Sequence, residues 1–144
     1  MRRFLLNFHD LPLDVNALIA FGLHEHEWHD RVARWVKEVV AAEQTALATC
    51  AVTGLGFLRI LIQAPSYSFT IAQGKTLLSR LKMAKGLHFT FLADDQGIAD
   101  LPLWVRGPKQ ITDGHLLGLA KKHGARLATL DEQIPGAMLI PRKP

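Results

Sequence analysis

Leu-Asp-Val-Asn-Ala-Leu-Ile-Ala, residues 13–20, is the stretch that decides the fold. The apolar run from Leu11 to Val15 predicts a short strand, and Asn16, a residue type favoured at helix caps, is followed by good helix formers. Asp14 therefore stands where a strand gives way to a helix. In α/β proteins ligands bind at that place, beyond the carboxyl ends of the strands.

The alternation of helix and strand continues along the chain. The further predicted elements are a helix at 28–42, a strand at 45–50, a helix at 53–62, a basic-faced helix at 71–85, a strand at 87–92, a helix at 111–122, a strand at 126–130 and an edge strand at 137–140. Strands that alternate with helices favour right-handed crossovers and a mainly parallel sheet. We therefore predict an α/β protein whose sheet is covered on both faces.

Length and composition indicate a single globular domain. The 144 residues are 49% hydrophobic and 21% charged, and the net charge of +4 favours an anionic partner, although it also suits ordinary solubility. The only cysteine, Cys50, excludes an internal disulfide, so a reducing, cytoplasmic setting is the default. Asp10 and Asp14 interrupt the apolar N-terminal stretch, which argues against export, and no apolar run approaches the roughly 20 residues of a membrane span.

Two further aspartates form a candidate cluster with Asp14. Asp113, in Gln-Ile-Thr-Asp-Gly-His-Leu-Leu (110–117), opens a predicted helix, and Asp131 follows the strand at 126–130. Parallel strands end at one edge of a sheet, so the three carboxylates can meet despite their separation in sequence. Taken singly, each also has a structural explanation as a cap or a turn residue. Crowded carboxylates raise one another's pKa, and a divalent metal ion relieves that repulsion.

A histidine-rich stretch offers a competing metal site. His24, His26 and His29 supply enough imidazoles for zinc, and Glu25 and Asp30 lie beside them. They fall in a loop and in the first turn of an amphipathic helix, without a further fixed ligand. We therefore interpret them as a solvated histidine cluster.

Five motifs follow one another over almost the whole chain. They are Leu-Asp-Val-Asn-Ala-Leu-Ile-Ala (13–20), the His/Glu-rich stretch before an Arg-Trp helix (24–35), Ala-Thr-Cys-Ala-Val-Thr-Gly-Leu-Gly-Phe-Leu-Arg (48–59), Ile-Thr-Asp-Gly-His-Leu-Leu-Gly-Leu-Ala (111–120) and Gly-Ala-Arg-Leu-Ala-Thr-Leu-Asp (124–131). In this order and spacing they resemble the PIN-domain ribonucleases of the VapC toxin type. The resemblance implies a single PIN-like nuclease domain over residues 1–144, built as a three-layer α/β/α sandwich around a mainly parallel central sheet.

The resemblance also implies a function and a site. The family cleaves RNA endonucleolytically with Mg²⁺ or Mn²⁺, as toxins of type II toxin–antitoxin modules that a cognate VapB-like antitoxin restrains. By motif, Asp14, Asp113 and Asp131 stand at three of the family's acidic positions. Asp14 and Asp113 are then expected to bind the metal, and Asp131 to complete its shell or orient a water. Asn16 and Thr112 are expected to tune the carboxylates through hydrogen bonds.

The fourth acidic position departs from the family pattern. A glutamate is usual in the Thr-Glu-x-Gly-Phe segment, and Gly54 stands there instead, offering neither charge nor ligand. Asp95, at another predicted strand end, is a candidate to compensate for it, and a turn residue is the alternative. Two functions therefore stay open: an active metal-dependent endoribonuclease, and a catalytically weakened PIN-like domain that binds RNA or a partner protein. An unrelated α/β phosphohydrolase ranks low, because no Asp-x-Asp motif or phosphate-binding glycine-rich loop is present.

The apolar content of two predicted helices points to partner surfaces. Trp28, Trp35, Phe57 and Leu61 exceed what one core face obviously needs. Part of this set is expected to form a dimer or antitoxin surface, and core packing is the alternative for most of it. We expect a homodimer that binds RNA and an antitoxin.

Overall fold

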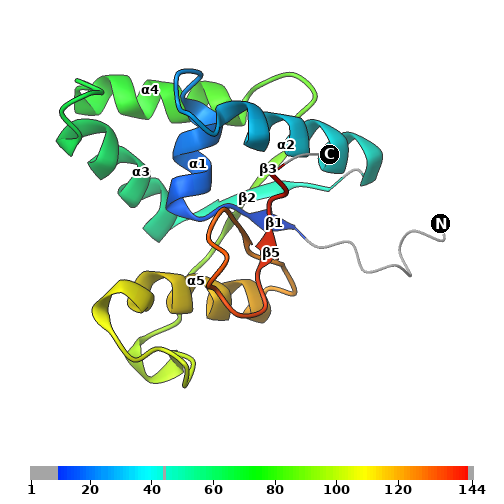
Figure 1. The fold of residues 1–144 in the computed structure, drawn as a ribbon, viewed down its shortest axis with the longest axis vertical. Helices are drawn as coiled ribbons and strands as arrows, with labels where there is room; N and C mark the ends of the chain where they lie inside the picture. The colour runs from blue at the N-terminus through cyan, green and yellow to red at the C-terminus, as the bar shows by residue number, and fades with distance from the viewer. Residues whose placement is uncertain (1–9, 44, 143–144) are drawn as a thin grey trace.

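The computed structural model describes residues 10–43 and 45–142 (Figure 1). Its elements in chain order are β1 (Leu11–Pro12), α1 (Val15–Gly22), α2 (His29–Glu43), β2 (Leu47–Cys50), α3 (Ala51–Gln63), α4 (Ile71–Lys82), β3 (Phe89–Leu92), the short 3₁₀ helices η2 (Ile98–Asp100) and η3 (Pro108–Gln110), α5 (Ile111–Lys122), β4 (Ala128–Thr129) and β5 (Met138–Leu139). None of the described helices is long and apolar enough to cross a bilayer.

All the described strand pairs are parallel. β2 lies between β1 and β3, and β4 pairs with β5. A parallel bridge between Leu13 and Ala128 joins the two sets, so the strands follow the order β3-β2-β1-β4-β5. The backbone N–H of Asp14 donates to the carbonyl of Ala128 at 3.2 Å across this junction. The parallel sheet predicted from the sequence is confirmed.

Helices cover both faces of the sheet (Figure 1). Helices α1 to α4 lie on one face and α5 on the other. Side chains alternate along β2, so Leu47 packs into the core beneath α1–α4 whereas Ala48 and Cys50 pack into the core beneath α5. Phe57 of α3 and Leu119 of α5 are buried in these two cores. The arrangement is the three-layer α/β/α sandwich that the family resemblance implied.

Most predicted elements are confirmed, and their ends differ for local reasons. The first strand stops at Pro12 instead of Val15, because the Asp14 side chain accepts a hydrogen bond from the Ala17 N–H and caps α1. Helix α3 begins at Ala51, earlier than predicted, because the Thr53 hydroxyl accepts a hydrogen bond from the backbone N–H immediately before the helix.

Of the four apolar residues considered for a partner surface, three are buried and one is exposed. Trp35, Phe57 and Leu61 are buried in the core beneath α1–α4, so the core-packing alternative is correct for them. Trp28 alone of the four remains exposed, at 43% of its surface.

Two glycines of α3 have opposite surroundings. A Cβ on Gly56 would lie 2.7 Å from Cγ2 of Val15 in α1, a distance that requires the neighbour to shift. A Cβ on Gly54 would have Cδ2 of Leu78 as its nearest neighbour at 3.9 Å, an ordinary contact. Gly56 therefore allows α3 to approach the start of α1, whereas Gly54 leaves room for a side chain.

We predict that Gly56→Ala lowers the free energy of unfolding by about 1–3 kcal/mol, because the new methyl group overpacks the contact with Val15. Gly54→Ala in the same helix is the matched control, and we expect it to raise stability by up to about 1 kcal/mol through helix propensity. Urea titrations followed by circular dichroism measure both changes. Equal effects of the two substitutions would show that the Val15 contact does not constrain the helix.

Candidate active site

Asp14 is a buried carboxylate with two hydrogen-bond donors. Its side chain and backbone are together 5% exposed. The Ala17 N–H donates to Oδ1 at 2.8 Å, and the Thr129 hydroxyl donates to Oδ2. The same Thr129 oxygen accepts a hydrogen bond of 2.9 Å from the Asp131 N–H. Thr129 thus links the carboxylate after β1 to the backbone after β4.

The structure brings the three predicted aspartates together at the carboxyl end of the sheet. Burial raises the pKa of Asp14 to about 6, against the hydrogen bonds from Thr129 and Ala17, and the charges of Asp113 and Asp131 raise it further. Asp113, in the first turn of α5, has its pKa raised by burial and then by the charge of Asp131. Asp131 is itself exposed. The three acids are therefore close enough to influence one another's charge, as predicted, and their roles as metal ligands stay a prediction.

This donor set suits a hard divalent cation. Within residues 10–43 and 45–142, no three His, Cys, Asp or Glu side chains converge on one ion-sized position. Mg²⁺ does not require such convergence, because it keeps several waters and takes only one or two protein carboxylates. A cation beside Asp14 and Asp113 would also counter the burial and repulsion that raise their pKa values. The residues present fit the ion that the family resemblance implies.

An open pocket of about 390 Å³ lies beside the cluster. Asp14, Asp131 and Glu132 line it, with Arg31, Arg142 and Trp28, and Arg142 is ion-paired with Glu132. Acidic and cationic groups thus share one cavity. Such an arrangement can hold a phosphate-containing chain, with one phosphate near the acids and others near the arginines.

Arg31 fixes one wall of this pocket. Its guanidinium is buried and donates through Nε to the carbonyls of Ile140, at 3.1 Å, and Pro141, at 3.2 Å. Burial lowers the pKa of Arg31, the charge of Arg142 lowers it further, and Glu132 opposes both effects. The sequence does not reveal this role, because an arginine among the polar positions of an amphipathic helix carries no sign of a backbone partner 109 residues away.

The predicted supporting residues have separate positions. Asn16 is exposed and lines the acidic pocket. Thr112 is exposed and lines a different hollow together with His115, whose ring pairs with Asp94. The hydrogen bond that tunes Asp14 comes instead from Thr129, which the sequence analysis missed although it lies two residues before a candidate ligand.

Asp95 lies outside the acidic cluster. Its carboxylate forms an ion pair with Lys122 and accepts a hydrogen bond from the side chain of Gln96. Lys122 follows Asp113 by two and a half turns at roughly 3.6 residues per turn, so the two project from opposite sides of α5. Compensation by Asp95 for the missing glutamate stays a prediction without support from these contacts.

The histidine-rich stretch is ordered by its own contacts. The rings of His24 and His29 stack with centroids 4.4 Å apart, and Nδ1 of His29 lies 2.9 Å from the Ala20 carbonyl. Nδ1 of His26 accepts a hydrogen bond from the Trp28 N–H at 3.0 Å. These contacts fix the loop that enters α2 beside the acidic pocket.

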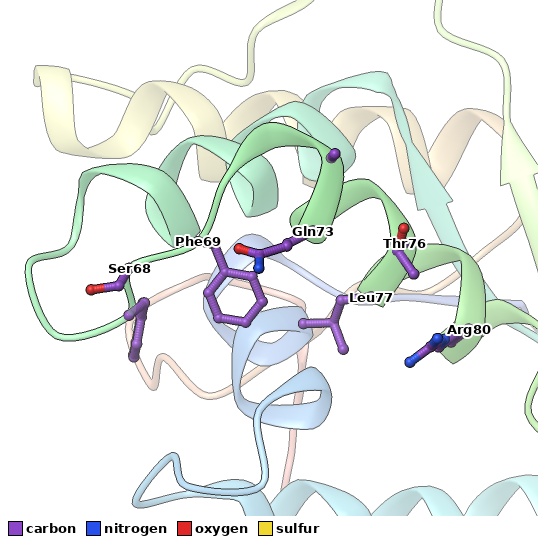
Figure 2. Close-up of a pocket in the computed structure, with 8 residues that line it drawn as sticks. Ser68, Phe69, Gln73, Thr76, Leu77 and Arg80 are labelled. Carbon is purple, nitrogen blue, oxygen red and sulfur yellow. The ribbon is translucent and has the colours of Figure 1, made fainter.

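A larger hollow, of about 590 Å³, lies between α4 and the loop before it. Figure 2 shows Phe69, Gln73 and Leu77 around it, with Ser68 and Arg80 nearer its ends. None of its lining residues is acidic, and it shares none with the acidic pocket. The larger hollow therefore lacks the carboxylates that make the acidic pocket the candidate site.

The sheet, its flanking helices and the three gathered aspartates define a PIN-domain protein. No protein-family model matches the chain. Among curated proteins of Mycobacterium tuberculosis, the chain is 40% identical to ribonuclease VapC38 over 124 residues, which are 83% of each chain. It is 33% identical to ribonuclease VapC44 over 135 residues, covering 87% of this chain and 92% of that protein. The chain therefore belongs to the VapC family.

A solved structure supports the same fold. The crystal structure of Mycobacterium tuberculosis VapC20, described as a toxin that cleaves the sarcin–ricin loop, matches with a TM-score of 0.61. The match covers 92% of this chain and 100% of that one at 11% sequence identity. At this identity the likeness establishes the arrangement of elements alone.

The raised pKa of Asp14 predicts how stability depends on pH in chelator-treated protein. The folded protein keeps this proton up to a pH of about 6, whereas the unfolded chain releases it near the ordinary pKa of 3.8. The folded state binds more protons in this interval, so its free energy of unfolding falls as the pH rises through it, by up to about 3 kcal/mol.

Asp14→Asn removes this titration and should flatten the corresponding part of the pH profile. Urea unfolding of both proteins at closely spaced pH values measures the difference between the two curves. Parallel curves would contradict a buried, proton-retaining Asp14.

Proposed function

We propose that the chain is a single-domain endoribonuclease, dependent on Mg²⁺ or Mn²⁺, that acts in the cytoplasm as the toxin of a toxin–antitoxin pair. The observation that carries the proposal is the gathering of Asp14, Asp113 and Asp131 at the carboxyl end of the sheet. The ribonuclease names of the relatives VapC38 and VapC44 support it.

Each acid has a separate task in the proposed reaction. Asp14 and Asp113 would hold the ion, and Asp131, which is exposed, would complete the shell or orient the attacking water. When bound, the ion would neutralise charge on the phosphate and lower the pKa of a water. Thr129 acts as a positioning residue, because its oxygen bonds the Asp14 carboxylate and the Asp131 backbone together.

The pocket can accept a polyanionic chain once a cation offsets its carboxylates. Arg31 and Arg142 line the cavity with Asp14, Asp131 and Glu132, and Arg142 is ion-paired with Glu132. The protein as a whole carries a net charge of +4, which increases the rate of encounter with RNA at low ionic strength. Asn16, exposed at the same pocket, is a hydrogen-bond donor for the RNA backbone.

Asp14→Asn should reduce divalent-ion-dependent RNA cleavage at least about 100-fold, because it removes a ligand charge that surrounding groups cannot replace. Asp30→Asn, at an exposed acid of α2, is the matched control and should cleave like the wild type. Gel analysis of RNA incubated with Mg²⁺ or Mn²⁺ measures the rates. Robust cleavage in the presence of EDTA would refute the metal-dependent mechanism.

Gly54 favours a second candidate function, a weakened nuclease that binds RNA or a partner protein. The chain lacks a carboxylate at this position, yet a side chain there meets nothing closer than Leu78 at 3.9 Å. Gly54→Glu, compared with Gly54→Ala, therefore tests the site without a steric penalty at the first carbon. A large gain in cleavage for the glutamate variant alone would indicate a weakened native site, and equal rates would mean that three aspartates suffice.

The partners of this toxin follow from the same proposal. We infer a cognate VapB-like antitoxin that covers the acidic pocket, and a homodimer as the functional unit. Exposed apolar side chains support the dimer: Ile98 is 89% exposed and Ile111 49% exposed, and together with Val52 and Leu101 they line a hollow of about 310 Å³. Apolar groups in contact with each other at the surface are typical of association sites.

Ile98→Asp should shift the protein from dimer to monomer, because a charge at a contact between copies would be desolvated. Met83→Asp is the matched control, since Met83 is 82% exposed at the end of α4 and does not line that hollow. Light scattering coupled to size-exclusion chromatography gives the masses. A wild-type monomer, or a dimer unaffected by Ile98→Asp, would contradict this interface.

A further inference from the structure

We propose that Trp28 stacks on a base of the bound RNA, beside the nucleotide whose phosphate lies at the acidic cluster. This inference rests on the proposed ribonuclease function and adds to it the residue that holds the substrate. Trp28 lines the same pocket as Asp14 and Asp131, so a single short stretch of RNA can touch the acids and the indole.

Trp28 is exposed, whereas the other tryptophan of this region, two helical turns later, is buried. Trp35 of α2 is 5% exposed and packs into the core, whereas Trp28, immediately before α2, is 43% exposed at the pocket. Core packing therefore does not account for the indole. A large aromatic surface left at the rim of a reactive cavity is available to a ligand.

The backbone of Trp28 is fixed, and two groups border its ring. The backbone N–H of Trp28 donates to Nδ1 of His26, and the Trp28 carbonyl accepts the N–H of Val32 at 3.1 Å in the first turn of α2. The His26 ring lies in tilted contact, with centroids 6.2 Å apart, and the guanidinium of Arg31 lies 5.7 Å from the indole centroid. The backbone bonds fix where the side chain begins, and the two ring contacts limit the positions of the indole, which reduces the entropy that stacking would cost.

The chemistry around Trp28 matches a nucleotide. Arg31 donates to backbone carbonyls, and within residues 10–43 and 45–142 it forms no direct ion pair with a carboxylate, although the charge of Glu132 acts on it across the pocket. A phosphate placed near Arg31 and a base placed on the indole would use both features at once. The pocket volume of about 390 Å³ is within the usual range for small-ligand sites.

Stacking on one indole does not require a defined sequence, because every base has a flat face. Trp28 would therefore contribute affinity and register, placing the adjacent phosphate at the acids. Selection of a particular RNA would depend on other contacts.

The first test measures binding without cleavage. Full-length protein in EDTA is titrated with a short single-stranded RNA of mixed sequence, and its tryptophan fluorescence is recorded. An abasic ribose-phosphate oligomer of the same length and charge is the matched ligand. We expect quenching by the RNA, much weaker quenching by the abasic oligomer, and loss of the RNA signal in Trp28→Phe. Equal quenching by the two ligands, or an unchanged signal in Trp28→Phe, would overturn the proposal.

The second test uses an RNA that the wild-type protein cleaves at a mapped position. Trp28→Leu keeps an apolar side chain without a π face and should raise KM by about 5- to 100-fold with kcat nearly unchanged. Trp28→Phe should recover most of the affinity, and removal of the stacked base from the RNA should affect the wild type but not Trp28→Leu.

A structural role for Trp28 would instead lower the thermal stability of Trp28→Leu or change kcat, and would contradict stacking. An unchanged KM for Trp28→Leu would also contradict stacking. This holds even if Trp28→Leu weakens binding of an antitoxin, because the indole would then serve that partner and not the RNA. If the wild type cleaves no RNA, the proposed function fails, and the fluorescence titration still decides whether the indole stacks on a base.

Discussion

The hydrogen bond from the Thr129 hydroxyl to Asp14 is the contact on which the site depends. A buried carboxylate is costly unless it is hydrogen-bonded or paired, and Asp14 has donors on each oxygen. By accepting the Ala17 N–H, Asp14 caps α1. By accepting the Thr129 hydroxyl, it links the carboxyl ends of β1 and β4. The same threonine oxygen receives the Asp131 N–H. The hydrogen bonds among Asp14, Thr129 and Asp131 therefore form one small network. It fixes the start of α1, the pairing of β1 with β4, and the positions of two acids.

Acidic and basic side chains line the same pocket. Burial, and then repulsion between the acids, raise the pKa values of Asp14 and Asp113, while Arg31 and Arg142 line the pocket that Asp14 and Asp131 also line. A bound cation would neutralise the carboxylates, and a bound polyanion would neutralise the arginines. Metal and RNA are thus expected to favour each other's binding, since each neutralises charge that the other must approach.

Much of this arrangement was accessible from the sequence, because it follows from periodicity. Apolar runs and helical spacing predicted the strands and helices, and the rule that ligands bind at strand ends predicted that Asp14, Asp113 and Asp131 would meet.

What the sequence did not predict depends on contacts between distant segments. Thr129 looked like an ordinary strand residue and Arg31 like an ordinary solvent-facing one, and each is explained by a partner more than a hundred residues away. Thr112, chosen by its closeness to Asp113 in sequence, lines a different hollow. Spacing along the chain predicts which face a residue occupies, but it does not predict which group another segment will bring to that face.

The long separation between Asp14 and Thr129 has a consequence for synthesis. Asp14 leaves the ribosome early, whereas the hydroxyl that holds it is made 115 residues later. Until then β1 can pair with β2, but Asp14 lacks Thr129, and neither β4 nor Asp131 has been made. Contacts between residues so far apart in sequence slow folding, because closing the long loop between them costs entropy. The network that holds Asp14 can therefore close only after most of the described chain has been synthesised.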